Sequence, residues 1–239
     1  MMAFIYGIAC YIIFFGTFVY VVGFTGNFLV PKNINSGTPT SLTSALIINI
    51  ALLSLFAVQH SIMARPGFKR CWTRVIPKVV ERSTYVFFSS VALIVLVWQW
   101  RPMLGIVWQI ESTIAQSIIY GVFALGWLIV FASSCMIDHF ELFGLKQIFY
   151  HVRKKQLKEH NFKKPALYRL VRHPIMLGFL IAFWATPTMT VGHLVFATTM
   201  TVYIVIGICF EERDLLCHFG EDYSKYQKEV SMLLPFPKR

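Results

Sequence analysis

Two polar clusters flank the last apolar region of the chain, and both contain residue types that bind small charged ligands. The first is the segment Arg172-His173-Pro174, and the second is the pair Glu211-Glu212. Proline suits the first position of a helix, and a helix N-terminus carries partial positive charge. The segment around His173 is therefore a favourable place for an anionic group. Two glutamates at the end of an otherwise uncharged helix are costly without a partner, which favours a functional role.

Four apolar runs precede these clusters, and each is long enough to cross the roughly 30 Å hydrocarbon core of a bilayer. The runs are residues 3–24, 42–63, 83–100 and 114–137. A fifth apolar region, residues 175–210, is too long for one span and contains Pro187. We expect two helices that meet in a tight turn there, because proline ends or kinks a helix. The sequence predicts an all-α polytopic membrane protein with four transmembrane helices and a C-terminal helical hairpin, five to six membrane helices in all.

The basic residues indicate the orientation in the membrane. All of the 22 Lys and Arg residues except Lys32 and Arg101 lie in residues 64–83, 138–174 and 211–239. Because basic loops stay on the cytosolic side, these segments and both termini are predicted to be cytosolic, with the bacterial inner membrane as the expected location. The hairpin is required for this topology, and it should bring the two polar clusters together. Residues 138–172 can also be interpreted as a membrane-surface helix.

The composition excludes several classes of protein. Hydrophobic residues make up 56% of the chain and charged residues 14%, so a soluble domain would lack polar surface. The net charge is +11, but the basic residues lie in the loops between apolar runs. They therefore indicate how the chain is oriented in the membrane and do not indicate nucleic-acid binding. The five cysteines have no CxxC spacing, which indicates neither a disulfide framework nor a zinc ribbon. No GxGxxG motif or strand alternation is present, so a soluble Rossmann fold is excluded.

The C-terminal part of the chain contains an ordered series of motifs. Arg-His-Pro is followed by the apolar hairpin, the paired glutamates, a Phe-Gly, a Tyr-x-x-Tyr and a terminal proline. This series resembles that of the isoprenylcysteine carboxyl methyltransferase-like membrane enzymes. Residues 59–69, the Glu81-Arg82 pair and residues 138–147 resemble the NnrU-like branch, and within it the methanethiol S-methyltransferases. Met176 stands where many relatives have an aromatic residue, and its thioether keeps the apolar character.

The resemblance implies a methyltransferase that uses S-adenosylmethionine and releases S-adenosylhomocysteine. We expect one transmembrane domain, residues 1–239, in which residues 1–137 line the substrate side and residues 138–239 form the cofactor pocket. The chemistry agrees, since the cofactor needs a cation for its carboxylate, a carboxylate for its ammonium or ribose diol, and apolar walls for adenine. The predicted cofactor-binding residues are Tyr168, Val171, Arg172, His173, Pro174, Leu177, Gly178, Glu211 and Glu212.

A thiol acceptor would also need to lose its proton, because an alkyl thiol is mostly protonated at neutral pH. His60 lies at the cytosolic end of the second span and His139 just after the fourth, at the same predicted membrane depth. We expect one of them to be the base and Arg65 or Arg82 to favour the thiolate. A metal site using His60 and His139 with Asp138 is an alternative, but the spacing matches no known ligand pattern, and no metal is predicted.

Simpler interpretations and competing functions remain at this point. Histidines near helix ends are more often interfacial or capping residues than catalysts, and Arg172 and His173 could anchor a helix at the headgroups. The leading prediction is S-methylation of a small thiol, methanethiol to dimethyl sulfide. The alternatives are methylation of a prenyl-cysteine carboxylate or a lipid headgroup, and a non-catalytic NnrU-like membrane factor. The expected partners are the thiol and membrane lipid, with neither nucleic acid nor an obligate protein partner implied.

Overall fold

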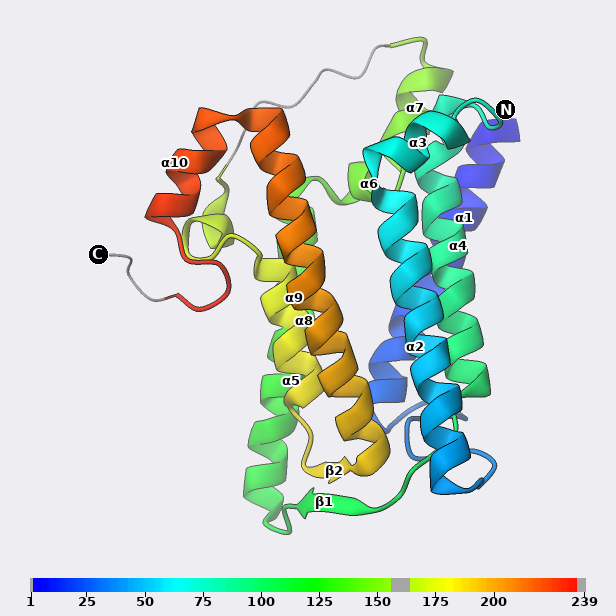
Figure 1. The fold of residues 1–239 in the computed structure, drawn as a ribbon, viewed down its shortest axis with the longest axis vertical. Coiled ribbons are helices and arrows are strands. Elements are labelled where there is room, and N and C mark those ends of the chain that lie inside the picture. The colour runs from blue at the N-terminus through cyan, green and yellow to red at the C-terminus, as the bar shows by residue number, and fades with distance from the viewer. Residues whose placement is uncertain (1, 156–163, 236–239) are drawn as a thin grey trace. The chain divides into compact units, whose positions relative to one another are not determined.

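The structure, a computed structural model, describes residues 2–155 and 164–235. Within this part of the chain, five helices are long and apolar enough to cross a membrane (Figure 1). They are α1 (Met2–Gly26), α2 (Leu42–Ala64), α4 (Lys78–Gln99), α5 (Thr113–Ile137) and α9 (Val191–Phe219). A sixth apolar helix, α8 (Pro174–Trp184), is shorter. The prediction of an all-α integral membrane protein is confirmed, and the first four spans lie close to their expected positions.

Shorter elements connect these helices. They are α3 (Pro66–Trp72), α6 (His139–Leu142), α7 (Leu145–Val152), the 3-10 helix η1 (Ala166–Arg169), α10 (Glu221–Glu229), and the strands β1 (Ile106–Gln109) and β2 (Thr188–Thr190). The segment interpreted as one surface helix, residues 138–172, contains α6, α7 and η1, and its residues 156–163 lie outside the described part. The sequence did not predict the pairing of β1 with β2, since strands this short carry no alternating pattern.

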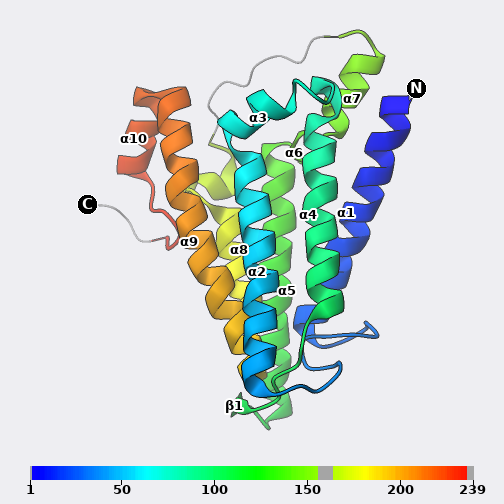
Figure 2. The ribbon, with the colours of Figure 1, turned by 45° about the vertical axis from the view of Figure 1, so that its right-hand side comes forward.

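The chain divides into two compact units, and the first contains α1 to α4, α6, α7 and the first residues of α9. In this unit α1 and α2 both contact α4, and α7 contacts α1 and α4. Figure 2 shows α3, α6 and α7 at the end of the bundle where α1 begins. Ile148 of α7 is fully buried over Gly7 of α1, where an added Cβ would lie 2.1 Å from its Cδ1 atom. Because Gly7 has no side chain, Ile148 of α7 can pack directly against the backbone of α1.

The other end of this unit is held by two fully buried polar side chains. The indole nitrogen of Trp100 donates to the carbonyl of Ile34 at 3.0 Å. The amide of Asn49 bonds both backbone groups of Arg101, at 2.7 and 2.9 Å. Because buried polar groups need partners, these bonds join the loop after α1 and the end of α4 to the bundle.

The second unit contains α5, η1, α8, α10 and most of α9. In this unit α5 and α8 approach closely at Gly126 and Gly178, where a Cβ on Gly178 would lie 2.7 Å from the Gly126 carbonyl oxygen. Small residues allow membrane helices to contact each other along the backbone. Trp127 packs edge-on against Phe179 and Phe183 beside this contact. The interface between α5 and α8 is therefore built from glycines flanked by aromatic rings.

The hairpin predicted near Pro187 is confirmed, but its two helices are unequal. α8 has 11 residues and α9 has 29. α9 continues beyond the apolar region without a break, so Glu211 and Glu212 lie inside the helix, two turns before its end. Gly220 then adopts a positive φ of 55°, and α10 follows.

The close contact of α5 with α8 predicts the effect of adding one methyl group. Gly178→Ala should lower the stability of the folded protein by about 1–3 kcal/mol, because the backbone of α5 cannot move away easily. Gly121→Ala is the matched control, since no atom lies within 4 Å of a Cβ at that position of α5. Thermal unfolding of both variants in detergent measures the difference. Equal melting temperatures for the two variants would contradict this description of the interface.

Candidate active site

The segment before α8 is held by backbone hydrogen bonds to the residues that follow α10. Val171 forms a parallel bridge with Ser231, and the amide of Arg172 donates to the Ser231 carbonyl at 2.8 Å. The amide of His173 donates to the Met232 carbonyl at 3.2 Å. Pro174 is the first residue of α8, as the sequence indicated. In the segment where an anionic group was expected, the backbone amides of Arg172 and His173 are therefore already bonded within the protein.

Arg172 is the centre of this region, and its side chain is only 6% exposed. Its Nε donates to Glu212 Oε1 at 2.7 Å. Its Nη1 donates to the carbonyls of Gln227 and Val230, at 3.0 and 2.6 Å, at the C-terminal end of α10. The guanidinium of Arg172 thus joins the start of α8 to α9. It also bonds the carbonyls at the end of α10, which have no partner within that helix.

Glu212 accepts hydrogen bonds from several elements of the same unit. His173 Nε2 lies 3.1 Å from its Oε1, and Gln227 Nε2 donates to its Oε2 at 2.9 Å. The Tyr223 hydroxyl lies 3.5 Å from Oε1. Glu212 is also largely buried, with 14% of its side chain exposed. The structure therefore brings Arg172, His173 and Glu212 together as the hairpin topology led us to expect.

Glu211 lies beside this network and has a different environment. Its Oε2 is 3.4 Å from His173 Nδ1, and 46% of its side chain is exposed. Burial by itself lowers the pKa of His173, but the hydrogen bonds and charges of Glu211 and Glu212 outweigh it and raise the pKa above its usual value. Glu211 thus stabilises the imidazolium while much of its carboxylate stays accessible.

The Tyr168 hydroxyl is buried and has no hydrogen-bond partner among the described residues. The backbone carbonyl of Tyr168 accepts a bond from the Tyr226 hydroxyl at 2.5 Å, which fixes the segment. Burial raises the pKa of Tyr168, and the nearby carboxylate of Glu211 raises it further. Burial likewise raises the pKa of Tyr226 to about 12. Tyr168 therefore stays a neutral donor, close to Glu211, with its hydrogen unused.

The remaining residues predicted to bind the cofactor lie in or next to this cluster. Val171 and Pro174 are buried at the start of α8. Leu177 is half-buried in the first turn, where its amide donates to the His173 carbonyl at 3.0 Å. Gly178 faces α5, and its contact with Gly126 and Val130 explains the glycine at this position. Contact between these residues and a cofactor stays a prediction.

The four residues predicted to act on a thiol all lie in the first unit. His60 bonds two residues of α4, since its Nδ1 is 3.1 Å from Ser89 Oγ and its Nε2 is 2.7 Å from the Tyr85 hydroxyl. Arg82 donates from Nε to the Leu142 carbonyl at 2.7 Å, and its guanidinium carbon lies 5.3 Å from the centre of the Tyr85 ring. Tyr85 therefore connects His60 to the positive charge of Arg82.

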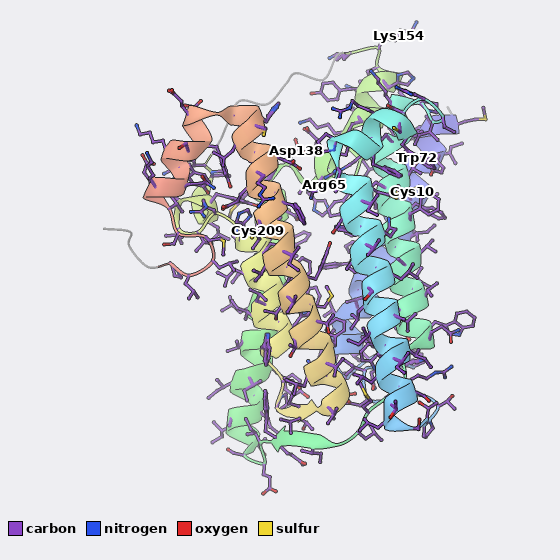
Figure 3. All side chains as sticks on the ribbon, in the orientation of Figure 1. Cys10, Arg65, Trp72, Asp138, Lys154 and Cys209 are labelled. Carbon is purple, nitrogen blue, oxygen red and sulfur yellow. The ribbon has the colours of Figure 1, made fainter. Side chains whose placement is uncertain are left out.

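His139 and Arg65 have other surroundings. His139 Nε2 lies 2.9 Å from the Tyr11 hydroxyl, and the His139 ring also contacts Phe143, which packs against the cluster around Tyr85. Arg65 lies at the junction of α2 and α3 (Figure 3), where its Nε donates to the Ser61 carbonyl at 3.3 Å. Within the described residues, no three His, Cys, Asp or Glu side chains form a group that could hold a metal ion.

Sequence reasoning overlooked Tyr85 and Ser89 in the first unit and Gln227 in the second. A signal for the first two was present, since Arg82, Tyr85 and Ser89 follow the i, i+3, i+7 spacing of one helix face in a largely apolar helix. Polar residues on one face of a membrane helix indicate a site or a partner. For Gln227 no such signal exists, because it lies in a polar helix.

Comparison with known proteins identifies the class of this membrane protein. A sequence model of the NnrU family, described as NnrU protein, matches residues 48–234. Methanethiol S-methyltransferase 2 of Bradyrhizobium diazoefficiens is 53% identical over 97% of this chain and 89% of its own length. The methanethiol S-methyltransferase of Mycobacterium tuberculosis is 50% identical over 98% of this chain and 96% of its own.

Mouse Nurim is more distant, with 30% identity over 73% of this chain and 70% of its own length. No solved structure matches this chain. The fold is that of a polytopic helical membrane protein with a buried ionic cluster in its C-terminal part. The chain belongs to the NnrU family, which confirms the resemblance seen in its motifs.

The buried ion pair predicts a large effect for removing one partner. Glu212→Gln leaves the Arg172 guanidinium buried without a counter-ion and should destabilise the protein by about 3–5 kcal/mol. Glu229→Gln is the control, since its 2.8 Å ion pair with Lys164 is exposed and should contribute little. Thermal unfolding in detergent compares the two. If Glu212→Gln unfolded at the same temperature as Glu229→Gln, the ion pair would not be a main structural contact.

The raised pKa of His173 predicts how its contribution to stability depends on pH. The folded protein binds this proton more tightly than the unfolded chain, so the contribution is complete below pH 6.5, the usual value, and is lost as pH rises through the folded pKa. The melting temperature of the wild type should therefore exceed that of His173→Asn most at about pH 6 and least at about pH 9. A difference that stays constant or grows with pH would contradict the assignment.

Proposed function

We propose that this protein transfers the methyl group of S-adenosylmethionine to methanethiol, releasing dimethyl sulfide and S-adenosylhomocysteine. The chain is a methyltransferase, since several relatives at about half identity across nearly its whole length carry that name. The methyl donor, the acceptor and the membrane face are the proposal. The observation that carries it is the meeting of the buried Arg172 and His173 with Glu211 and Glu212 in one ionic cluster.

The groups in this cluster fit the proposed cofactor. The Tyr168 hydroxyl is a buried donor with no partner among the described residues, and Glu211 is a half-exposed carboxylate close to it. A buried donor without an internal partner is costly, so a ligand acceptor at that point would stabilise it. S-adenosylmethionine has hydroxyls, an ammonium and a carboxylate, and it supplies, when bound, a methyl group that a thiolate can attack.

We assign the residues of the cluster to two tasks. Glu211 would bind the ammonium or the ribose diol, and Tyr168 would donate its free hydrogen to an acceptor of the nucleoside. His173 faces Glu211 and Glu212 with its two ring nitrogens, so it would hold Glu211 in place for this contact. Arg172 and Glu212 are positioning residues, because they bond each other and Arg172 also bonds two backbone carbonyls within the protein. Leu177 and Val171 would contribute to the apolar wall for adenine.

On the acceptor side, the protein must position a thiol and remove its proton. His60 and His139 are the candidate bases, each hydrogen-bonded to a tyrosine that orients its ring. Arg82 supplies a fixed positive charge near His60. A one-carbon thiol needs no docking domain, and the apolar surroundings of these groups suit it. A reacting thiolate must lie about 3 Å from the methyl carbon, so positioning is a large part of catalysis.

We place this chemistry on the cytosolic side of a bacterial inner membrane, with both termini in the cytosol. The distribution of basic residues supports this orientation, since α3, the start of α4 and the polar connection after α5 contain most of the Lys and Arg residues.

Purified wild-type protein in detergent, supplied with labelled S-adenosylmethionine, tests the function against methanethiol, hydrogen sulfide and a prenyl-cysteine. We expect dimethyl sulfide, identified by gas chromatography, as the main product. Glu211→Gln should weaken S-adenosylhomocysteine binding about tenfold or more in calorimetry, because it loses a charge-assisted bond. Glu221→Gln, an exposed carboxylate of α10, is the control. Methylation of prenyl-cysteine alone, or no cofactor binding, would refute the proposal.

A further inference from the structure

We propose that Tyr226 is a positioning residue for the cofactor, because its hydroxyl holds the segment from which the Tyr168 side chain bonds the nucleoside. This inference rests on the proposed function, which assigns the Tyr168 hydroxyl to an acceptor of the nucleoside. Tyr168 belongs to η1 and Tyr226 to α10, and both lie in the second unit of the structure. The two tyrosines have different tasks at one site, since Tyr168 contacts the ligand and Tyr226 places that contact.

The Tyr226 side chain is buried and its hydrogen is already used within the protein. The residue is only 3% exposed, and its hydroxyl donates to the backbone carbonyl of Tyr168 at 2.5 Å. A tyrosine hydroxyl has one hydrogen, so Tyr226 has none left to donate to a ligand. The Tyr168 hydroxyl is the opposite case, because it is buried without a hydrogen-bond partner among the described residues. Of the two tyrosines, Tyr168 is therefore the one that can donate to the nucleoside.

The ring of Tyr226 packs against α9. Tyr223 and Tyr226 belong to one apolar cluster, and Leu215 and Phe219 of α9 pack against it. The ring centres of the two tyrosines lie 5.8 Å apart. Glu211 precedes Leu215 by about one turn of the same helix. Tyr226 therefore connects η1, which contains Tyr168, to the helix that contains Glu211.

A ligand that bonds Tyr168 and Glu211 together needs a constant spacing between them. Burial raises the pKa of Tyr168 and the carboxylate of Glu211 raises it further, so the two groups lie close together. The two residues nevertheless belong to separate elements, η1 and α9. A hydrogen bond is lost when its donor moves away by about 1 Å. Because Tyr226 bonds η1 and packs on α9, its hydroxyl maintains this spacing.

A second contact between this segment and α10 is exposed. Lys164 forms a 2.8 Å ion pair with Glu229, and its ammonium lies 5.0 Å from the centre of the Tyr226 ring. Exposed ion pairs contribute little, because water and salt screen them. We therefore expect the buried bond of Tyr226, and not this ion pair, to place Tyr168.

The experiment is a double-mutant cycle on S-adenosylhomocysteine binding, measured by calorimetry with the full chain in detergent. Tyr168→Phe and Tyr226→Phe should each weaken binding about tenfold, the effect of losing one hydrogen bond. The double variant should bind no more weakly than Tyr168→Phe, because Tyr226 acts through the Tyr168 hydroxyl. Phenylalanine keeps the aromatic ring at both positions, so the apolar cluster on α9 is retained.

Glu229→Gln is the matched control, since it removes the exposed contact between the same two segments and should leave the affinity unchanged. Steady-state kinetics with S-adenosylmethionine add a second readout. Tyr226→Phe should raise its KM about tenfold and change kcat less than about twofold, because the bond places the nucleoside and not the reacting methyl group. A purely structural role would instead lower the melting temperature and leave the affinity of the folded protein as in wild type.

The outcomes separate this inference from the proposed function. An unchanged affinity in Tyr226→Phe, or a double variant weakened about 100-fold, would overturn the positioning role while the loss in Tyr168→Phe still supports the cofactor site. An unchanged affinity in Tyr168→Phe would overturn both the positioning role and the assignment of Tyr168 to the nucleoside. A wild type that binds no S-adenosylhomocysteine would overturn the proposed function and this inference with it.

Discussion

A buried guanidinium is tolerated only where a counter-charge and hydrogen-bond acceptors replace the water it loses. The contacts of Arg172 show how this requirement organises the second unit. Glu212 supplies the charge, and the carbonyls of Gln227 and Val230 accept the remaining bonds. The start of α8, the interior of α9 and the end of α10 must therefore meet at one point. Tyr168 and Glu211 are held next to that point, with hydrogen-bonding capacity left for a ligand.

In the first unit, neutral polar groups likewise have partners that replace the water they lose. His60, Tyr85 and Ser89 lie on largely apolar helices and satisfy one another across α2 and α4. Polar groups in such helices persist where they have partners or a function. Here the hydroxyls of Ser89 and Tyr85 hold the histidine ring in place. The residues proposed for cofactor binding lie in the second unit, and the candidate bases lie in the first.

Much of this architecture could be predicted because it follows from hydrophobicity and backbone chemistry. Long apolar runs predict α1, α2, α4 and α5, and Pro187 predicts the break between α8 and α9. The meeting of Arg172 with Glu212 followed from the hairpin alone. The sequence could not show that α5 packs on α8, because Gly126 and Gly178 belong to separate helices, and only the folded chain places them in contact. Tyr85 was overlooked because a tyrosine in an apolar helix is usually a packing residue.

The most direct test of the central claim is an experimental structure of the protein in lipid nanodiscs with S-adenosylhomocysteine bound. The account predicts that the nucleotide lies against Glu211 and the Tyr168 hydroxyl while the ion pair of Arg172 with Glu212 stays intact. A nucleotide bound away from the start of α8 and the paired glutamates of α9 would contradict it.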